Sequence, residues 1–72
     1  MLEVRNSNGQ KYTLQEYLRE FPEGIFQIES KIFGRMITGD KDYILGHLRN
    51  TYFGACVQGI DECEYGKIIY LR

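Results

Sequence analysis

The sequence predicts a small α+β domain, a mostly antiparallel β-sheet with two helices packed on one face. Two segments place apolar residues at helical spacing directly after good helix-start residues. The segments before, between and after them show the alternation or β-branched enrichment of strands. At 72 residues the chain has room for one core, so these elements belong to a single domain, residues 1–72. The expected order is strand, helix, one or two strands, helix, strand, strand.

Residues 1–6 are expected to form the first strand. They alternate loosely, with Leu2 and Val4 on one face. Asn8-Gly9 follows and is the strongest short turn signal of the chain, because both residue types tolerate a positive φ. A short hairpin arm at residues 10–12 is therefore expected to pair back onto the first strand.

The first helix begins at a capping box. In the sequence T-L-Q-E, the Thr13 hydroxyl can accept from the Glu16 amide, and the Glu16 carboxylate can accept from the Thr13 amide. Apolar residues then recur at spacings of three and four, at Leu14, Tyr17, Leu18 and Phe21. Pro22 disfavours helical geometry at the residue before it, so the helix should end there after about two turns.

The segment "GIFQIESKIFGRMITG", residues 24–39, fits both a helix and a strand. A helical wheel gathers its apolar residues on one side, but Glu29 then falls near the middle of that side, where an unpaired carboxylate is costly. Gly34 would also lie in the helix interior, at a cost of about 1 kcal/mol relative to Ala. Both residues favour a strand, as do the four Ile residues of the segment.

As a strand, this segment separates an apolar face from a polar face. The expected apolar face holds Phe26, Ile28, Ile32 and Met36, and the polar face holds Gln27, Glu29, Lys31 and Arg35. The run exceeds the usual strand length of about five or six residues, so it should bend, bulge near Ser30 or Gly34, or split. Whether residues 25–38 form one strand, two strands or a helix stays open at this stage.

The second helix is expected over residues 41–53. Asp40 is a good N-cap, and Asp42 lies in the first turn, where the helix dipole favours negative charge. Gly54 is well placed as the stop signal. The apolar stripe consists of Ile44, Leu45, Leu48 and Tyr52. After it, residues 55–60 and 67–71 should pair as a hairpin around a loop at residues 61–66.

Composition excludes several classes of protein. Nine basic and ten acidic residues give a net charge of −1, without the basic excess that phosphate-driven binding requires. No segment approaches the roughly 18 apolar residues of a transmembrane helix, and residues 1–9 lack an apolar signal region. We therefore expect a cytoplasmic protein without a membrane partner, in which Cys56 and Cys63 are reduced. A single disulfide between them stays an alternative.

No motif predicts catalysis, a cofactor or a metal. His47 with Cys56 or Cys63 could supply a Cys-His site, or with Asp61 a zinc site, but the spacing of the cysteines does not match the usual ligand pairs. Asp40 and Asp42 start a calcium-loop pattern that the rest of the loop does not continue. Glycine-rich phosphate motifs are absent. A non-enzymatic protein without cofactor or metal is the expectation, and a Cys-dependent enzyme is the third alternative.

The function expected from these features is binding of a protein partner through an exposed sheet face. Mixed charge with aromatic residues suits recognition of protein surfaces, where Arg and Tyr are frequent hot spots. The candidate residues are Gln27, Glu29, Lys31 and Arg35, with Tyr65 and Tyr70 as second choices. The size is that of stand-alone regulators and inhibitors, such as those of phages and mobile elements. A sheet edge could also pair with its copy in a homodimer.

A nucleic-acid-binding module is the main alternative. The C-terminal "YGKIIYLR" combines Tyr65 and Tyr70 with Lys67 and Arg72, as single-stranded nucleic-acid sheets do for stacking and phosphate contact. In a strand, however, Lys67 points away from the face of Tyr70. The neutral overall charge also makes nucleic acid the weaker alternative.

Overall fold

A computed structural model describes residues 2–72 and shows two α-helices, a 3-10 helix and four strands. In chain order these are α1 (Leu14–Glu20), β1 (Ile25–Ser30), β2 (Gly34–Asp40), α2 (Lys41–His47), η1 (Asn50–Gly54), β3 (Val57–Cys63) and β4 (Gly66–Leu71). The strands form one sheet of order β2-β1-β4-β3. The outer pairs β1–β2 and β3–β4 are antiparallel, and the central pair β1–β4 is parallel.

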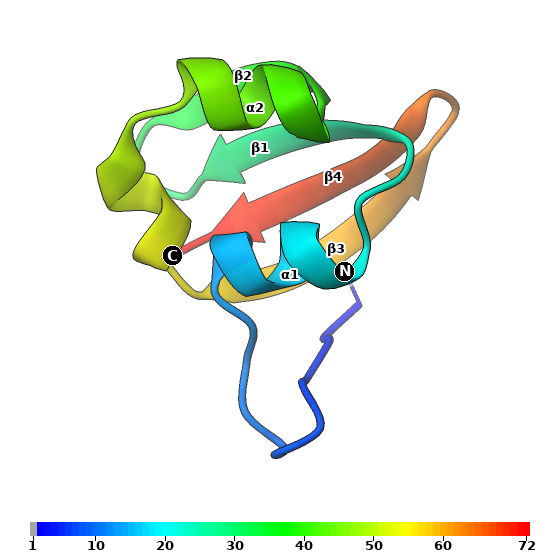
Figure 1. The fold of residues 1–72 in the computed structure, drawn as a ribbon, viewed down its shortest axis with the longest axis vertical. Coiled ribbons are helices and arrows are strands. Elements are labelled where there is room, and N and C mark those ends of the chain that lie inside the picture. Colours follow the sequence, from blue (N-terminus) through cyan, green and yellow to red (C-terminus); the bar gives the residue numbers. More distant parts are fainter. Residues whose placement is uncertain (1) are drawn as a thin grey trace.

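Both helices cover the same face of this sheet. Figure 1 shows α2 in front of the β1–β2 half and α1 in front of the β3–β4 half, with η1 beside them. The predicted α+β class, with two helices on one face of a mostly antiparallel sheet, is therefore confirmed. The core lies between the two layers, and its fully buried members include Phe26, Ile28 and Ile69 from the two central strands.

The predicted start of α1 is confirmed in detail. The Thr13 hydroxyl accepts from the Glu16 backbone amide at 3.2 Å, and a Glu16 carboxylate oxygen accepts from the Thr13 amide at 3.1 Å. The buried face of this helix consists of Leu14, Tyr17 and Leu18. The helix ends at Glu20, and Phe21 already has non-helical angles before Pro22.

The ambiguous segment is two strands joined by a turn at residues 31–33. Gly34 begins β2 with φ +74°, a value that favours glycine. The expected faces hold only in part: Phe26 and Ile28 face the core, but Ile32 lies in the turn and is 77% exposed. Lys31 lies in the same turn, so its place on the polar strand face was wrong. A register shift opposite Ile28 and Glu29 adds a bulge to β2.

The second helix is shorter than predicted. Asp40 caps it as expected, accepting from the Tyr43 amide at 2.8 Å, but α2 ends at His47 and η1 follows. In one continuous helix Ile44 and Phe53 would lie about 180° apart, at about 100° per residue. The extended residue Leu48 breaks the helix, and both Ile44 and Phe53 are buried. Leu45, expected in the stripe, is 46% exposed.

The N-terminal segment does not form a strand of the sheet. Among residues 2–13 the pairing consists of isolated bridges, at Leu2↔Ile60, Arg5↔Lys11 and Thr13↔Cys56; Met1 lies outside the described residues. The turn differs as well: Gly9 has φ +79°, but Asn8 does not have a positive φ. Asn6 closes the turn, because its side-chain oxygen accepts from the amides of Asn8 and Gln10.

The C-terminal hairpin is longer than predicted. β3 runs to Cys63 and β4 starts at Gly66, so the loop expected over residues 61–66 shrinks to a turn at residues 64–65. Asp61 and Glu62 pair with Ile68 and Lys67 across the hairpin. The polar residues therefore extend the strand instead of ending it, because alternate positions point away from the core.

Candidate functional site

The face of the sheet opposite the helices carries no other element of residues 2–72 (Figure 1). Because Phe26 and Ile28 point into the core, their neighbours in β1 point to this open face. The strand register aligns side chains in rows across the sheet. One row contains Arg35, Glu29 and Tyr70. The next contains Thr38, Gln27, Ile68 and Asp61. We call these two rows, together with Tyr65, the open-face row set.

Tyr65 ties the turn between β3 and β4 to the middle of the open face. Its hydroxyl donates to Oε1 of Gln27, and Nε2 of Gln27 donates to Oε2 of Glu29. Gln27 is only 4% exposed although it lies on the open face. This chain of hydrogen bonds leaves each of the three side chains with a neighbour that fixes its orientation.

Tyr70 and Asp61 form a second polar pair on the same face. The Tyr70 hydroxyl donates to a carboxylate oxygen of Asp61 at 2.9 Å. This bond favours the charged carboxylate and the neutral phenol, so it lowers the pKa of Asp61 and raises the pKa of Tyr70. The pKa of Tyr65 is also raised, first by desolvation and then by a contact with Cys63. Both tyrosines are therefore neutral donors at pH 7.

The structure brings five of the six candidate residues together. Gln27, Glu29, Arg35 and Tyr70 lie in the two rows, and Tyr65 folds over them from the turn. Lys31 is the exception, since it belongs to the turn at residues 31–33. Arg35 lies directly across from Glu29 on the neighbouring strand, so opposite charges stand side by side.

The sequence-based candidates left out three residues of the second row, Thr38, Asp61 and Ile68, and the exposed Phe33 outside the two rows. Asp61 and Ile68 complete the second row, and the alternation within "IDEC" was the signal that would have placed Asp61 on it. Phe33, 66% exposed in the β1–β2 turn beside Ile32, packs its ring edge-on against Tyr52 at 6.4 Å between centroids. Hairpin turns usually carry Gly, Asn, Asp or Ser, so no turn rule identified this apolar tip.

Of the residues considered for catalysis and metal binding, His47 contacts Tyr43 in its own helix. His47 stacks on Tyr43 at 4.1 Å, and its Nδ1 lies 2.9 Å from the Tyr43 carbonyl oxygen. Cys56 and Cys63 are free, half-buried thiols. Within residues 2–72 no group of three or more His, Cys, Asp or Glu side chains is placed to hold a metal ion.

The fold separates two of the residues considered for nucleic-acid binding, Lys67 and Tyr70. Tyr70 lies on the open face, whereas Lys67 pairs with Phe26 and Glu62 and points to the helix side. A stacking ring and the nearest basic group of β4 therefore lie on opposite faces of the sheet.

Comparison with protein-family models, curated proteins and solved structures finds no match for this chain. None of the helices in the described part of the chain has the length and apolarity needed to cross a membrane.

Proposed function

We propose that this protein is a non-enzymatic binding module that recognises a protein partner through the open-face row set, as a regulator or inhibitor would. One observation carries this proposal: an uncovered sheet face presents ordered polar and aromatic side chains. Glu29 and Tyr70 are held in place by Gln27 and Asp61. Side chains fixed before binding lose less conformational entropy when a partner covers them, which favours specific recognition.

The charge pattern of the face supports a protein partner more than a nucleic acid. Arg35 stands beside Glu29, and Asp61 lies one row away, so the face offers both signs of charge. A phosphate backbone would be repelled by the two carboxylates, whereas a protein surface can match each charge separately. Tyr70 and Ile68 add the apolar area that an interface core needs.

A crosslinking experiment can identify the partner and test the face together. A photo-crosslinking amino acid at Thr38, exposed on the open face, should capture the partner in cells of the native host. The same amino acid at Arg19, exposed on α1, serves as the matched control and should not capture it. The captured protein is then purified and titrated against the unlabelled chain by calorimetry.

Substitutions test the assignment of residues. Arg35→Glu places a second carboxylate beside Glu29 and should weaken binding about tenfold or more. Arg19→Glu, which makes the same charge change on the helix side, should change the affinity less than about twofold. Equal losses in both variants, or an unchanged affinity in Arg35→Glu with the thermal midpoint preserved, would contradict the proposed site.

A further inference from the structure

A pocket of about 610 Å³ opens beside the edge strand β3, and Asp61 is the one residue of the open-face row set among its lining residues. It lies between the end of α1, the N-terminal segment and the β3–β4 hairpin. Its lining residues are Leu2, Val4, Tyr17, Phe21, Ile60, Asp61, Glu62 and Lys67. Volumes of about 300–1,000 Å³ are typical of sites for small organic ligands.

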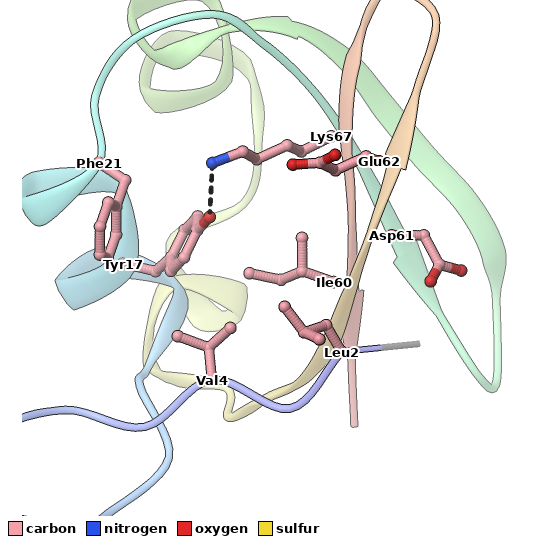
Figure 2. Close-up of a pocket in the computed structure, with 8 residues that line it drawn as sticks. All are labelled: Leu2, Val4, Tyr17, Phe21, Ile60, Asp61, Glu62 and Lys67. Atoms are coloured by element: carbon pink, nitrogen blue, oxygen red, sulfur yellow. Dashed lines mark hydrogen bonds between the residues drawn. The ribbon is translucent and has the colours of Figure 1, made fainter.

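The floor and walls of this pocket are apolar and held in place. Tyr17 and Ile60 are 2% and 5% exposed and belong to the core. Leu2 is fixed by two backbone hydrogen bonds to Ile60, each 2.8 Å long, which bring the N-terminal segment against the edge of β3. Figure 2 shows Val4 and Leu2 on one side of the hollow and the rings of Tyr17 and Phe21 on another.

One ammonium group reaches into the pocket. Lys67 extends across it, with Nζ 3.5 Å from the Tyr17 hydroxyl and 5.8 Å from the centre of the Phe21 ring (Figure 2). Among residues 2–72 no ion pair joins Lys67 to a carboxylate. The contacts of the Lys67 ammonium in this structure are a long hydrogen bond to the neutral Tyr17 hydroxyl and a cation–π contact with the Phe21 ring.

Two acidic residues line the pocket in different ways. Asp61 points away from the hollow, toward the open face where it accepts from Tyr70 (Figure 2). Glu62 is exposed and lies directly across from Lys67 in the hairpin. Glu62 extends to the same side of the hairpin as Lys67 (Figure 2), so its carboxylate reduces the positive potential at the Lys67 ammonium.

We propose that this pocket binds a small organic acid with an apolar body, such as an aryl or alkyl carboxylate. The body would pack against Tyr17, Phe21 and Ile60, and the carboxylate would accept from Lys67 Nζ and the Tyr17 hydroxyl. A charge-assisted hydrogen bond in a largely apolar site is stronger than a neutral one. The volume suits a single small molecule, and the site does not depend on the proposed protein-binding face.

The test compares three ligands that differ only in the head group: 2-naphthoate, 2-naphthalenemethanol and 2-naphthylmethylamine. Because the chain has no Trp, naphthalene fluorescence can be titrated without interference from indole. We expect naphthoate to bind at least about tenfold more tightly than the alcohol, and the amine to bind most weakly. Amide NMR shifts caused by naphthoate should centre on Leu2, Val4 and Ile60.

Removing the charge of Lys67 and removing the charge of Glu62 should change the affinity for naphthoate in opposite directions, which tests the contact with the carboxylate. Lys67→Met keeps the apolar stem and should weaken naphthoate binding about tenfold, whereas Lys67→Arg should keep most of it. Glu62→Gln, at an exposed position where folding is not at risk, should tighten binding about two- to fivefold. Lys41→Met, a lysine outside the pocket, is the matched control and should leave the affinity unchanged.

Three results would overturn the proposal. The first is equal affinity for naphthoate and the alcohol. The second is that the amine has the highest affinity and that Glu62→Gln weakens the binding of the amine. The third is that the NMR shifts fall on residues outside the pocket. Loss of naphthoate binding in Lys67→Met counts for the proposal only if Lys67→Arg restores it and the circular dichroism spectra match.

Discussion

Gly66, the first residue of β4, packs directly against the backbone of β1 at Ile25. A β-carbon at this residue would lie 2.0 Å from the Ile25 carbonyl oxygen, which is a backbone atom and cannot rotate away. Gly66→Ala must therefore push the central parallel pair apart. We expect a loss of about 1–3 kcal/mol in the free energy of unfolding, measured by urea denaturation.

Gly46 is the matched control for this substitution. No atom lies within 4 Å of a β-carbon built there, and the residue is in α2. Gly46→Ala should therefore stabilise the protein by about 0.5–1 kcal/mol through helix propensity. If both variants lost stability equally, crowding at Gly66 would not be the cause.

Ile28 and Ile32 are the same residue type, predicted on the same strand face, but they have opposite environments. Ile28 is fully buried and Ile32 is 77% exposed. Ile28→Val should cost about 0.5–1.5 kcal/mol in unfolding free energy, because it leaves a space in the core. Ile32→Val should stay within about 0.5 kcal/mol. A comparable loss from Ile32→Val would show that the turn tip is packed in solution.

At the scale of elements, α1 depends on its capping box. Thr13→Ala removes the hydroxyl that accepts from the Glu16 amide and should cost about 1 kcal/mol. Thr51→Ala, at an exposed position of η1 without a side-chain cap, should be nearly neutral. Urea denaturation at pH 7 distinguishes the two.

The same capping box should make stability depend on pH. The Thr13 backbone amide, followed by its hydroxyl, lowers the pKa of Glu16 below its ordinary value of 4.5. A carboxyl with a lowered folded-state pKa contributes stability that is fully present above pH 4.5 and is lost as the pH falls through the folded-state pKa. Glu16→Gln should therefore destabilise the protein at pH 7 and much less at pH 2.5.

Glu23→Gln, in the exposed loop after α1, is the control for this pH dependence. Its stability should follow that of the parent protein across the whole range. If Glu16→Gln lowered the free energy of unfolding by the same amount at pH 7 and at pH 2.5, the charge of Glu16 would have no role in this stability.

For the whole molecule, the sheet order predicts a gradient of hydrogen exchange. β1 and β4 are central and carry the fully buried Phe26, Ile28 and Ile69, so their amides should exchange only by global unfolding. Residues 3–10 are tied by few backbone hydrogen bonds and should exchange first. Amides on the outer edge of β2 should also exchange early, as measured by NMR.

Protein concentration provides the control for the edge of β2. β2 is an edge strand without a neighbour on its outer side among the described residues. Protection of its amides that increased with concentration would indicate pairing of two copies through this edge, the homodimer that the sequence leaves open. Constant exchange rates would indicate that the edge stays unpaired.

Local chemistry alone was enough to predict several features. The Thr13 and Asp40 caps depend on residues within one helical turn, so the helix starts could be read directly. Glu29 favoured a strand over a helix, because a helix would have placed its carboxylate unpaired in an apolar face. The alternation of a strand then placed Gln27, Glu29 and Arg35 on one surface. The binding role of that surface remains a prediction.

The sequence by itself determined the helix starts, favoured strand over helix within residues 25–38, and placed Gln27, Glu29 and Arg35 on one polar face, because each of these depends on neighbours along the chain. Tertiary structure decided the rest. The helix breaks after His47 because Ile44 and Phe53 are then buried together. The parallel pairing of β1 with β4 depends on the close approach of their backbones at Gly66. The pocket depends on the bridge between Leu2 and Ile60. These contacts join residues far apart in the chain, so no local pattern contains them.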